Sequence, residues 1–547
     1  MQKSGRLELA SSMDSVEAIN RDWSVRRGGT AMCASSRRTW PWQGAIRCVV
    51  VTLVALSLLD RAECSTGWAG CHVHRPPPED RLFESKAVDA FLRDTLPRFK
   101  DERIARVVNV TLPNALDTTF LEVDGREDTF VITGDIKAMW LRDATFQVLP
   151  YLRFVKSDAP LRDAICGLLK RQARSIKIDR YANAFNFNAS GAGHQNDFRV
   201  PKMQKSVFEG KYELDSLVSF LKLSNEYSRS SVLGDSSTCF TESVHWLDAL
   251  SLTFRTLREQ QRSTAEDQPP SYKFVRSEMD LSYNGTGAAR KRTGLVSSGF
   301  RPSDDACALP FHVASNLWLR TELLRLVNET LPRLRRWVEE DEGKDKGGIG
   351  NGRLWNQLAA LGGEAEVIAR EVGEGIERHA CAPSPVDETE VVFAYEVDGY
   401  GSHVLMDDAN APSLLSLRYL GALSTRRDEE IFENTKRVVL SGASNPFYFA
   451  GKAAQGVGSP HVGYGFIWPL GLIYEAWATE DEGKLVEILE TLVSATAGTN
   501  CMHESFSKDD SAIYTRPWFA WANSAFGELI LHLVETKPWL LLKSSSV

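Results

Sequence analysis

The segment Glu213-Leu-Asp-Ser-Leu-Val-Ser-Phe-Leu-Lys-Leu-Ser-Asn-Glu-Tyr227 shows the pattern that decides the fold of this chain. Its apolar residues Leu214, Leu217 and Leu221 recur at spacings of three and four, and this period predicts an amphipathic helix. The same spacing recurs along the chain after about residue 83. It predicts further helices at Lys86–Phe99, Leu161–Ile178, Ser243–Glu259, Phe311–Trp337, Ala411–Leu420, Asp428–Ser441, Glu480–Ala497 and Ala520–Glu535.

Short loops rich in glycine, asparagine, aspartate and aromatic residues separate these predicted helices. Strand-like patterns are confined to Asp128–Thr133 and Glu390–Ala394, and surface insertions are expected at Arg262–Arg292 and Glu339–Gly352. Many helices joined by polar and aromatic loops suit an all-α toroid whose loops gather at one end. We therefore predict one large helical domain with a single site built from loops.

The composition is that of an ordinary soluble globular protein. The chain has 547 residues, of which 43% are hydrophobic and 25% are charged. These fractions exclude a disordered chain, a collagen, a coiled coil and a multi-span membrane protein. The 64 basic and 72 acidic residues give a net charge of −8, so the chain has no basic field to attract a polyanion and we expect no nucleic-acid partner.

The N-terminal residues are typical of an export segment. Trp23–Leu59 contains no acidic residue, and it ends in the apolar run Cys48–Leu59. This run is shorter than the about 20 residues of a spanning helix and suits a signal-peptide core, with Ala62-Glu-Cys64 as the cleavage region. An uncleaved signal anchor is the alternative. We predict a leader over residues 1–64, a linker over 65–82 and one domain over 83–547, in a protein that is secreted or lumenal in the secretory pathway.

Sequons and cysteines agree with an extracytoplasmic route. Four Asn-x-Ser/Thr sequons follow the apolar run, at Asn109, Asn188, Asn284 and Asn328. The cysteines after the leader show no CxxC spacing, which argues against zinc and predicts one or more disulfides whose pairing stays open. Buried free thiols are the alternative. These cysteines are Cys71, Cys166, Cys239, Cys307, Cys381 and Cys501.

Carboxylates, histidines, arginines and tryptophans concentrate in six loop regions. Carboxylates beside aromatic rings are typical of carbohydrate sites, because the acids bond sugar hydroxyls and the rings cover the apolar face of a pyranose. Hydrolysis of a glycoside needs one protonated and one ionised acid. The regions are Thr133–Asp143, Lys211–Leu217, Phe300–Ala306, Tyr395–Gly399 with Met406–Asn410, Gly458–His461, and His503–Phe506 with Thr515–Trp521.

Five ordered motifs in these regions resemble glycoside hydrolase family 125, and the similarity spans roughly Phe83 to Leu540. The resemblance implies a metal-independent exo-α-1,6-mannosidase with an inverting mechanism, no cofactor, and an (α/α)6 barrel, or six-hairpin toroid, with the active-site loops at one end. The motifs are Met139-Trp-Leu-Arg-Asp143, Tyr212-Glu-Leu-Asp-Ser-Leu217, Arg301-Pro-Ser-Asp-Asp-Ala306, Met406-Asp-Asp-Ala-Asn410 and His503-Glu-Ser-Phe506.

The resemblance also implies the catalytic pair. It makes Glu504 the general base, and either Asp304 or Asp305 the general acid. An aspartate beside a second carboxylate can keep its proton, which gives the doublet a chemical reason. The alternative is that Ser303 and the doublet cap a helix that begins near Ala306.

The remaining polar residues of the motifs are the predicted sugar ligands. Arg142 and Asp143 suit bidentate contacts to adjacent hydroxyls, with a structural ion pair as the alternative. A structural role is also open for His461 and for the aromatic residues near the last motif. The predicted substrate-binding set is Arg142, Asp143, Asp215, Asp407, Asp408, Asn410, His461, His503, Arg516 and Trp518, with no metal ligand.

The expected partner is a mannose-containing oligosaccharide or a glycoprotein glycan. We expect a monomer that meets a membrane only through an uncleaved N-terminal anchor. Two alternatives remain open at this point: a barrel glycosidase with another sugar specificity, because the toroid itself selects no substrate, and a carbohydrate-binding protein without catalysis.

Overall fold

The computed structural model describes residues 73–544 except 232–233, 235–237, 241–243, 278–279 and 343–348. The predicted leader, and residues 65–72 of the predicted linker, lie outside the described residues. The longer helices are α2 (Lys86–Thr95), α3 (Glu102–Thr111), α5 (Leu141–Val148), α6 (Ala159–Ile178), α7 (Leu214–Ser230), α9 (Val244–Gln260), α11 (Val313–Arg325), α12 (Leu331–Glu342), α13 (Ile349–His379), α15 (Arg426–Val439), α16 (Pro469–Ala478), α17 (Glu482–Ala495) and α18 (Ala520–Thr536); the short ones are α4 (Asn114–Thr118), α10 (Ser282–Gly285), α14 (Leu417–Leu420) and α19 (Pro538–Leu541).

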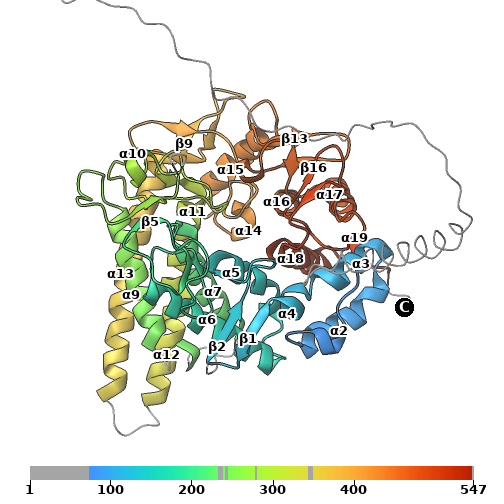
Figure 1. Ribbon diagram of the computed structural model, residues 1–547, viewed down its shortest axis with the longest axis horizontal. Coiled ribbons are helices and arrows are strands. Elements are labelled where there is room, and N and C mark those ends of the chain that lie inside the picture. The colour runs from blue at the N-terminus through green and yellow to red at the C-terminus, as the bar shows by residue number, and fades with distance from the viewer. Residues whose placement is uncertain are drawn as a thin grey trace, which may run out of the picture. The chain divides into compact units, whose positions relative to one another are not determined.

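Helices of the described chain pack in a closed circuit (Figure 1). In turn, α5 contacts α7, α7 contacts α11, α11 contacts α14, α14 contacts α16, α16 contacts α18, and α18 contacts α5 again. A second set packs against this circuit, with α6 on α7, α13 on α11, α17 on α16 and α3 on α18. Four of the six circuit helices, α7, α11, α16 and α18, therefore each have a second helix packed against them.

The burial pattern differs between a helix of the circuit and a helix outside it. Residues Val313–Leu323 of α11 are all buried, as expected for a helix that is surrounded by others. The helix α15 is amphipathic and buries Ile431 and Phe432 on one face only. A capping box between Thr425 and Asp428 begins α15, in which each side chain accepts from the backbone N–H of the other residue.

Aromatic side chains from four circuit helices meet around Phe146 of α5. The Phe146 ring stacks on Trp521 of α18 with centroids 5.1 Å apart. It also contacts Trp318 of α11 at 5.7 Å and Tyr419 of α14 at 6.2 Å. Large buried rings contribute strongly to packing energy, so this cluster ties the circuit together.

The strands of the described residues form only two- and three-stranded sheets. The all-α prediction therefore describes the helices but omits these sheets, which hold the loops of the site. The predicted strand patterns are confirmed as β2 and β10. The strands are β1 (Phe120–Asp124), β2 (Asp128–Val131), β3 (Met139–Trp140), β4 (Ala184–Phe185), β5 (Phe198–Val200), β6 (Val207–Glu209), β7 (Lys273–Val275), β8 (Phe311–His312), β9 (Cys381–Pro383), β10 (Val391–Phe393), β11 (Glu396–Val397), β12 (His403–Val404), β13 (Tyr448–Ala450), β14 (Gln455–Val457), β15 (Phe466–Ile467), β16 (Ser505–Ser507) and β17 (Tyr514–Thr515).

Some predicted elements differ from the observed ones. The helix predicted over Phe311–Trp337 is interrupted by a π-helical turn at Leu326–Thr330. Of the helix predicted over Ala411–Leu420, only the last turn, α14, is helical. The 31-residue helix α13 was not predicted, because its glycines weaken the helical pattern.

The second half of the predicted linker is part of the folded domain. Arg75 donates to the Asp117 carboxylate at 2.7 Å and to Asp89 at 2.6 Å. The backbone N–H of Leu82 donates to the carbonyl of Asp117 at 2.9 Å. Residues 73–82 are therefore docked on the helices rather than extended as a spacer.

Two further predictions concern cysteines and membranes. A disulfide joins Cys166 to Cys239, and Cys501 is also disulfide-bonded, whereas Cys307 and Cys381 are free thiols.

The helices of the described residues include none with the length and apolar content needed to cross a bilayer. The predicted signal or anchor segment lies outside those residues.

Candidate active site

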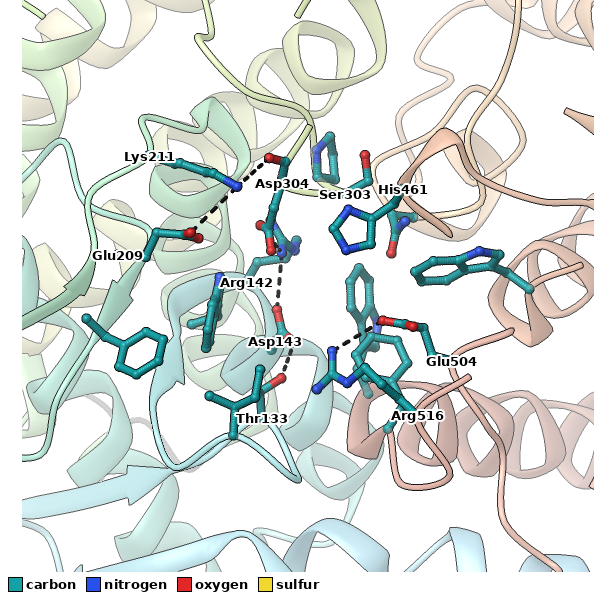
Figure 2. A pocket seen from close by; sticks show the side chains of 18 of the residues that line it. Thr133, Arg142, Asp143, Glu209, Lys211, Ser303, Asp304, His461, Glu504 and Arg516 are labelled. Atoms are coloured by element: carbon teal, nitrogen blue, oxygen red, sulfur yellow. Dashed lines mark hydrogen bonds and ion pairs between the residues drawn. The ribbon is translucent and has the colours of Figure 1, made fainter. Parts of the chain in front are cut away.

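A cavity of about 340 Å³ opens where the loops before several circuit helices meet (Figure 2). Its polar lining begins with Arg142 and Asp143 in the first turn of α5, and Trp468 lies immediately before α16. Trp521 in the first turn of α18 also contributes to the lining. The whole lining is Thr133, Ile136, Trp140, Arg142, Asp143, His194, Phe208, Glu209, Lys211, Arg276, Pro302, Ser303, Asp304, Asn410, His461, Trp468, Glu504, Arg516, Phe519 and Trp521.

The guanidinium of Arg142 is the centre of one side of the cavity. Its Nη1 lies 2.7 Å from Glu213 Oε2 and 3.1 Å from Asp215 Oδ2. Its Nη2 lies 3.2 Å from Asp304 Oδ1 and 3.4 Å from Asp143 Oδ2. One buried cation therefore holds four carboxyl groups together.

Burial and the shared cation shift the acid–base properties of this cluster in different directions. Burial raises the pKa of Glu213 well above its usual range, and the charge of Arg142 only partly opposes this. Burial likewise raises the pKa of Asp215 to about 6. Burial acts on Asp304 in the same direction, but Arg142, Lys211 and a hydrogen bond from Glu213 outweigh it and hold the pKa of Asp304 below its usual value.

The loop that carries Asp304 is held by backbone contacts. The backbone of Glu213 bridges that of Phe300, which places the following loop against the start of α7. Asp304 adopts a left-handed backbone with φ of 68°, and Lys211 Nζ donates to its carbonyl oxygen at 2.7 Å. Aspartate tolerates this conformation better than most residues do. The turn directs the Asp304 side chain to Arg142 and into the cavity.

Asp305 points to a different partner. Its Oδ1 lies 3.1 Å from His461 Nδ1, and Asp305 is not among the lining residues. Burial alone would lower the pKa of His461, but the pair with Asp305 and the charges of Asp304 and Glu504 raise it to about 9. His461 is therefore a cation at neutral pH, and it lines the cavity.

Glu504 is held on another side of the cavity by residues of the β15–β16–β17 sheet. Thr515 Oγ1 donates to Glu504 Oε2 at 2.9 Å, and Arg516 Nη1 donates to Oε1 at 3.3 Å. Arg516 is anchored in turn by a forked ion pair with Asp135. Ser505 is paired with Thr515 in the sheet, which fixes the orientation of Glu504. Figure 2 shows Glu504 and Asp304 on different sides of the opening.

The structure brings seven of the predicted site residues to the cavity wall and leaves six away from it. The seven are Arg142, Asp143, Asp304, Asn410, His461, Glu504 and Arg516; the six are Asp215, Asp305, Asp407, Asp408, His503 and Trp518. Each of the six has a protein partner that explains its position. Asp215 lies behind the wall, where it accepts from Arg142.

Two of these aspartates organise the loop before α14. Asp407 accepts backbone N–H bonds from Leu414 and Leu415, each at 2.9 Å. Asp408 accepts from the Asn410 side chain at 3.1 Å and so orients a residue that does line the cavity. Both aspartates therefore support the site through the backbone or through a neighbour.

His503 and Trp518 are packing residues of the last motif. The His503 ring stacks on Tyr514 with centroids 3.7 Å apart, and its Nδ1 lies 3.0 Å from the Pro517 carbonyl oxygen. Trp518 Nε1 donates to Asn114 at 3.3 Å. These contacts orient the strand and loop that present Glu504.

The alternative of a helix cap at the aspartate doublet is wrong. No helix begins near Ala306, and the next helix, α11, begins at Val313 with His312 as its cap. The turn at Asp304 is instead closed by a hydrogen bond from the Arg301 N–H to the Asp305 carbonyl at 2.7 Å. The doublet belongs to a turn rather than to a helix start.

Several lining residues were not predicted. Glu209 and Arg276 form an ion pair at 2.7 Å, and His194 lies beside Glu209 at 3.7 Å. They come from segments outside the motifs: His194 precedes β5 and Arg276 follows β7, two strands that pair with each other, and Glu209 ends β6. Trp140 lay within a motif, so only its neighbourhood was indicated. The signal for the others would have been long-range strand pairing, which periodicity does not show.

Comparisons with known proteins agree on one family. A family model for metal-independent α-mannosidases (GH125) matches residues 101–531. The meiotically up-regulated gene 157 protein of Schizosaccharomyces pombe is 37% identical over 508 residues, which cover 88% of this chain and 92% of the yeast protein. A metal-independent α-mannosidase of Streptococcus pneumoniae, solved in a non-productive complex with α-1,6-mannobiose, is 33% identical with a TM-score of 0.71, and the match covers 83% of this chain and 100% of that chain.

Proposed function

Because the chain belongs to the GH125 family of metal-independent α-mannosidases, we propose that it releases terminal, non-reducing α-1,6-linked mannose with inversion at the anomeric carbon. The observation that carries the proposal is the meeting of Asp304 and Glu504 in one cavity. The pneumococcal relative was solved with α-1,6-mannobiose, which supports the linkage.

In this mechanism the two carboxyl groups divide the acid and base roles. Asp304 protonates the leaving glycosidic oxygen, while Glu504 removes a proton from a water that attacks the anomeric carbon from the opposite face. The contacts from Thr515 and Arg516 hold the Glu504 oxygens in place as acceptors. Asp304 is preferred to Asp305 because only Asp304 lines the cavity.

The remaining lining suits a single sugar at the end of a chain. A cavity of about 340 Å³ lies near the lower end of small-molecule sites, which are roughly 300–1,000 Å³. Asp143 and Asn410 offer polar side-chain groups, and Trp140, Trp468 and Trp521 offer rings. This lining favours an exo-acting enzyme that binds one terminal mannose.

The fold and the cellular route are parts of the same proposal. The circuit of helices with a second set packed against it suits the (α/α)6 barrel, and we propose that architecture for the chain. The Cys166–Cys239 disulfide and the exposed sequon residues Asn188, Asn284 and Asn328 support passage through an oxidising secretory compartment. A mobility shift of the expressed chain on removal of N-glycans, lost in the triple variant Asn188→Gln, Asn284→Gln, Asn328→Gln, tests that route.

Incubation with α-1,6-mannobiose tests the activity. The expected result is free mannose in which the newly formed anomeric centre is β, detected by proton NMR within minutes of addition as an excess of β-mannose over the equilibrium mixture that the reducing-end unit contributes. Glu504→Gln should abolish turnover and retain mannose binding. Initial release of the α-anomer would refute inversion, and cleavage of α-1,2- or α-1,3-mannobiose in preference would refute the linkage.

A further inference from the structure

Glu213 has a place in the site that the acid and base roles leave unexplained. Its side chain is 0% exposed and does not line the cavity, whereas the Asp304 side chain is 22% exposed and does. A glutamate at this depth is costly to bury, so its contacts must compensate for lost hydration. These contacts connect it directly to Asp304.

The contacts of Glu213 leave no solvent around its carboxyl group. Oε2 accepts from Arg142 Nη1 at 2.7 Å and from Ser216 Oγ at 3.2 Å. Oε1 accepts from Asn183 Nδ2 at 2.9 Å. A further hydrogen bond joins the Glu213 carboxyl to that of Asp304. A hydrogen bond between two carboxyl groups requires a proton on one of them.

Charge balance gives the same result independently. Four carboxyl groups, those of Asp143, Glu213, Asp215 and Asp304, contact the single charge of Arg142. The next cation, Lys211, is bound to the Asp304 carbonyl rather than to a carboxyl oxygen of the cluster. If all four were ionised, four negative charges would share one guanidinium; Lys211 and His461 stabilise ionised Asp304 but have no described ion pair with the other three carboxyl groups, so the buried cluster must hold at least one proton.

The position of that proton follows from the surroundings of each acid. Burial raises the pKa of Glu213 well above its usual range, whereas Arg142, Lys211 and His461 stabilise the ionised form of Asp304. Asp215 lies in the first turn of α7, which begins directly after Glu213, and also contacts Arg142. It has no hydrogen bond to Asp304 among the described contacts. Burial also raises the pKa of Asp143, but its carboxyl accepts from Thr133 and has no described hydrogen bond to Asp304. Glu213 alone combines a raised pKa with a hydrogen bond to Asp304, so the proton that faces Asp304 lies on Glu213 in the free protein.

Building on the proposed function, we propose that Glu213 is a positioning residue that stores the proton of the general acid and passes it to Asp304 for catalysis. In the first step the Glu213 O–H bond breaks and an Asp304 O–H bond forms. That bond then breaks as the proton moves to the glycosidic oxygen and the C1–O bond cleaves. Water adds to C1 and gives one proton to Glu504, and exchange with solvent returns this proton to the Glu213–Asp304 pair.

The substitution Glu213→Gln tests this role sharply. Glutamine matches the protonated acid in size and in charge and still donates a hydrogen bond, but it cannot give up a proton. We expect turnover of α-1,6-mannobiose to fall at least 100-fold, within the range for loss of an acid catalyst. Turnover of 2,4-dinitrophenyl α-mannoside should fall less than about 5-fold, because that leaving group departs without protonation, and this retained activity shows that the site is folded.

Asp215→Asn is the matched control, because Asp215 is buried in the same helix and contacts the same Arg142 nitrogen at 3.1 Å. Since it acts only through Arg142, its substitution should lower both activities by the same factor. Equal losses on both substrates in Glu213→Gln would make Glu213 merely structural and overturn the proposal, as would full activity on mannobiose. Failure of the unsubstituted protein to cleave mannobiose would instead refute the proposed function.

Discussion

Substitution of each member of the aspartate doublet separates the acid from its neighbour. We expect Asp304→Asn to lower kcat/KM for α-1,6-mannobiose by about 10²–10⁴-fold, the usual effect of removing a general acid. Its carboxyl lies in the cavity, 3.2 Å from Arg142. An amide there preserves the shape of the side chain but has no proton to give to the leaving oxygen.

The structure predicts a much smaller effect for Asp305→Asn. This substitution removes an ion pair with His461 at 3.1 Å between side chains that are 31% and 38% exposed. Pairs this exposed contribute about 0.2–1 kcal/mol, which corresponds to about 1.4- to 5-fold in a rate or an equilibrium. The ratio between the two variants should therefore exceed about 20-fold.

The assay compares mannobiose with 2,4-dinitrophenyl α-mannoside for both variants under the same conditions. Asp304→Asn should retain most of its activity on the aryl mannoside, because a good leaving group needs no acid. Thermal unfolding of both variants controls for loss of fold. The assignment is refuted if Asp305→Asn shows the large, leaving-group-dependent loss and Asp304→Asn does not.

Three further predictions follow from contacts around the cavity. Thr515→Val removes the 2.9 Å hydrogen bond from Thr515 to Glu504. Hydrogen bonds to charged groups are worth about 1.5–3 kcal/mol, so kcat should fall about 10- to 150-fold on both substrates. An unchanged kcat would contradict a role of Thr515 in holding the base. Trp140 Nε1 is buried without a hydrogen-bond partner in the described part of the chain, and we expect it to donate to a sugar hydroxyl. Trp140→Phe should therefore weaken inhibition by mannose about 2- to 10-fold. An unchanged inhibition constant would exclude that contact. Burial lowers the pKa of His461, but Asp305 together with the charges of Asp304 and Glu504 raises it to about 9. The stability from these contacts is therefore complete below the unfolded value of about 6.5 and is lost as the pH rises through about 9; the share due to Asp305, measured as the difference in thermal midpoint between wild type and Asp305→Asn, should shrink over that interval, and a difference that grew with pH would contradict the sign.

Helical periodicity predicted the parts of the fold that depend on local sequence. The segments now seen as α6, α7, α9, α15, α17 and α18 each have a sustained apolar stripe, and their ends agree within a few residues. The helix α13 was not predicted, because glycines such as Gly362, Gly363 and Gly375 interrupt its pattern of apolar residues. Gly375 lies so close to the backbone of Leu295 and Thr293 that an added Cβ would come within 2.9 Å of both. Tertiary packing thus requires glycine at a position where helix propensity alone argues against it.

The site was predictable as a set of regions rather than as a set of contacts. The motifs located Arg142, Asp304 and Glu504, because carboxylates and arginines in aromatic loops are unusual outside functional sites. They could not separate residues that face the cavity from those that hold them. Asp407 and His503 are as polar as the lining residues, but their partners, Leu414 and Pro517, lie seven or more positions further along the chain, and only the folded chain shows that these contacts are structural.

The aspartate doublet shows why neighbouring residues of one type can have different roles. Along the chain Asp304 and Asp305 are equivalent, and the sequence left the acid undecided between them. The positive φ of 68° at Asp304 turns the backbone so that the two side chains meet different cations, Arg142 and His461. Arg142 belongs to a buried cluster that must hold a proton, whereas His461 belongs to an exposed pair that is already neutralised. The difference in chemistry therefore originates in one backbone angle, which places only one of two identical side chains beside a proton source.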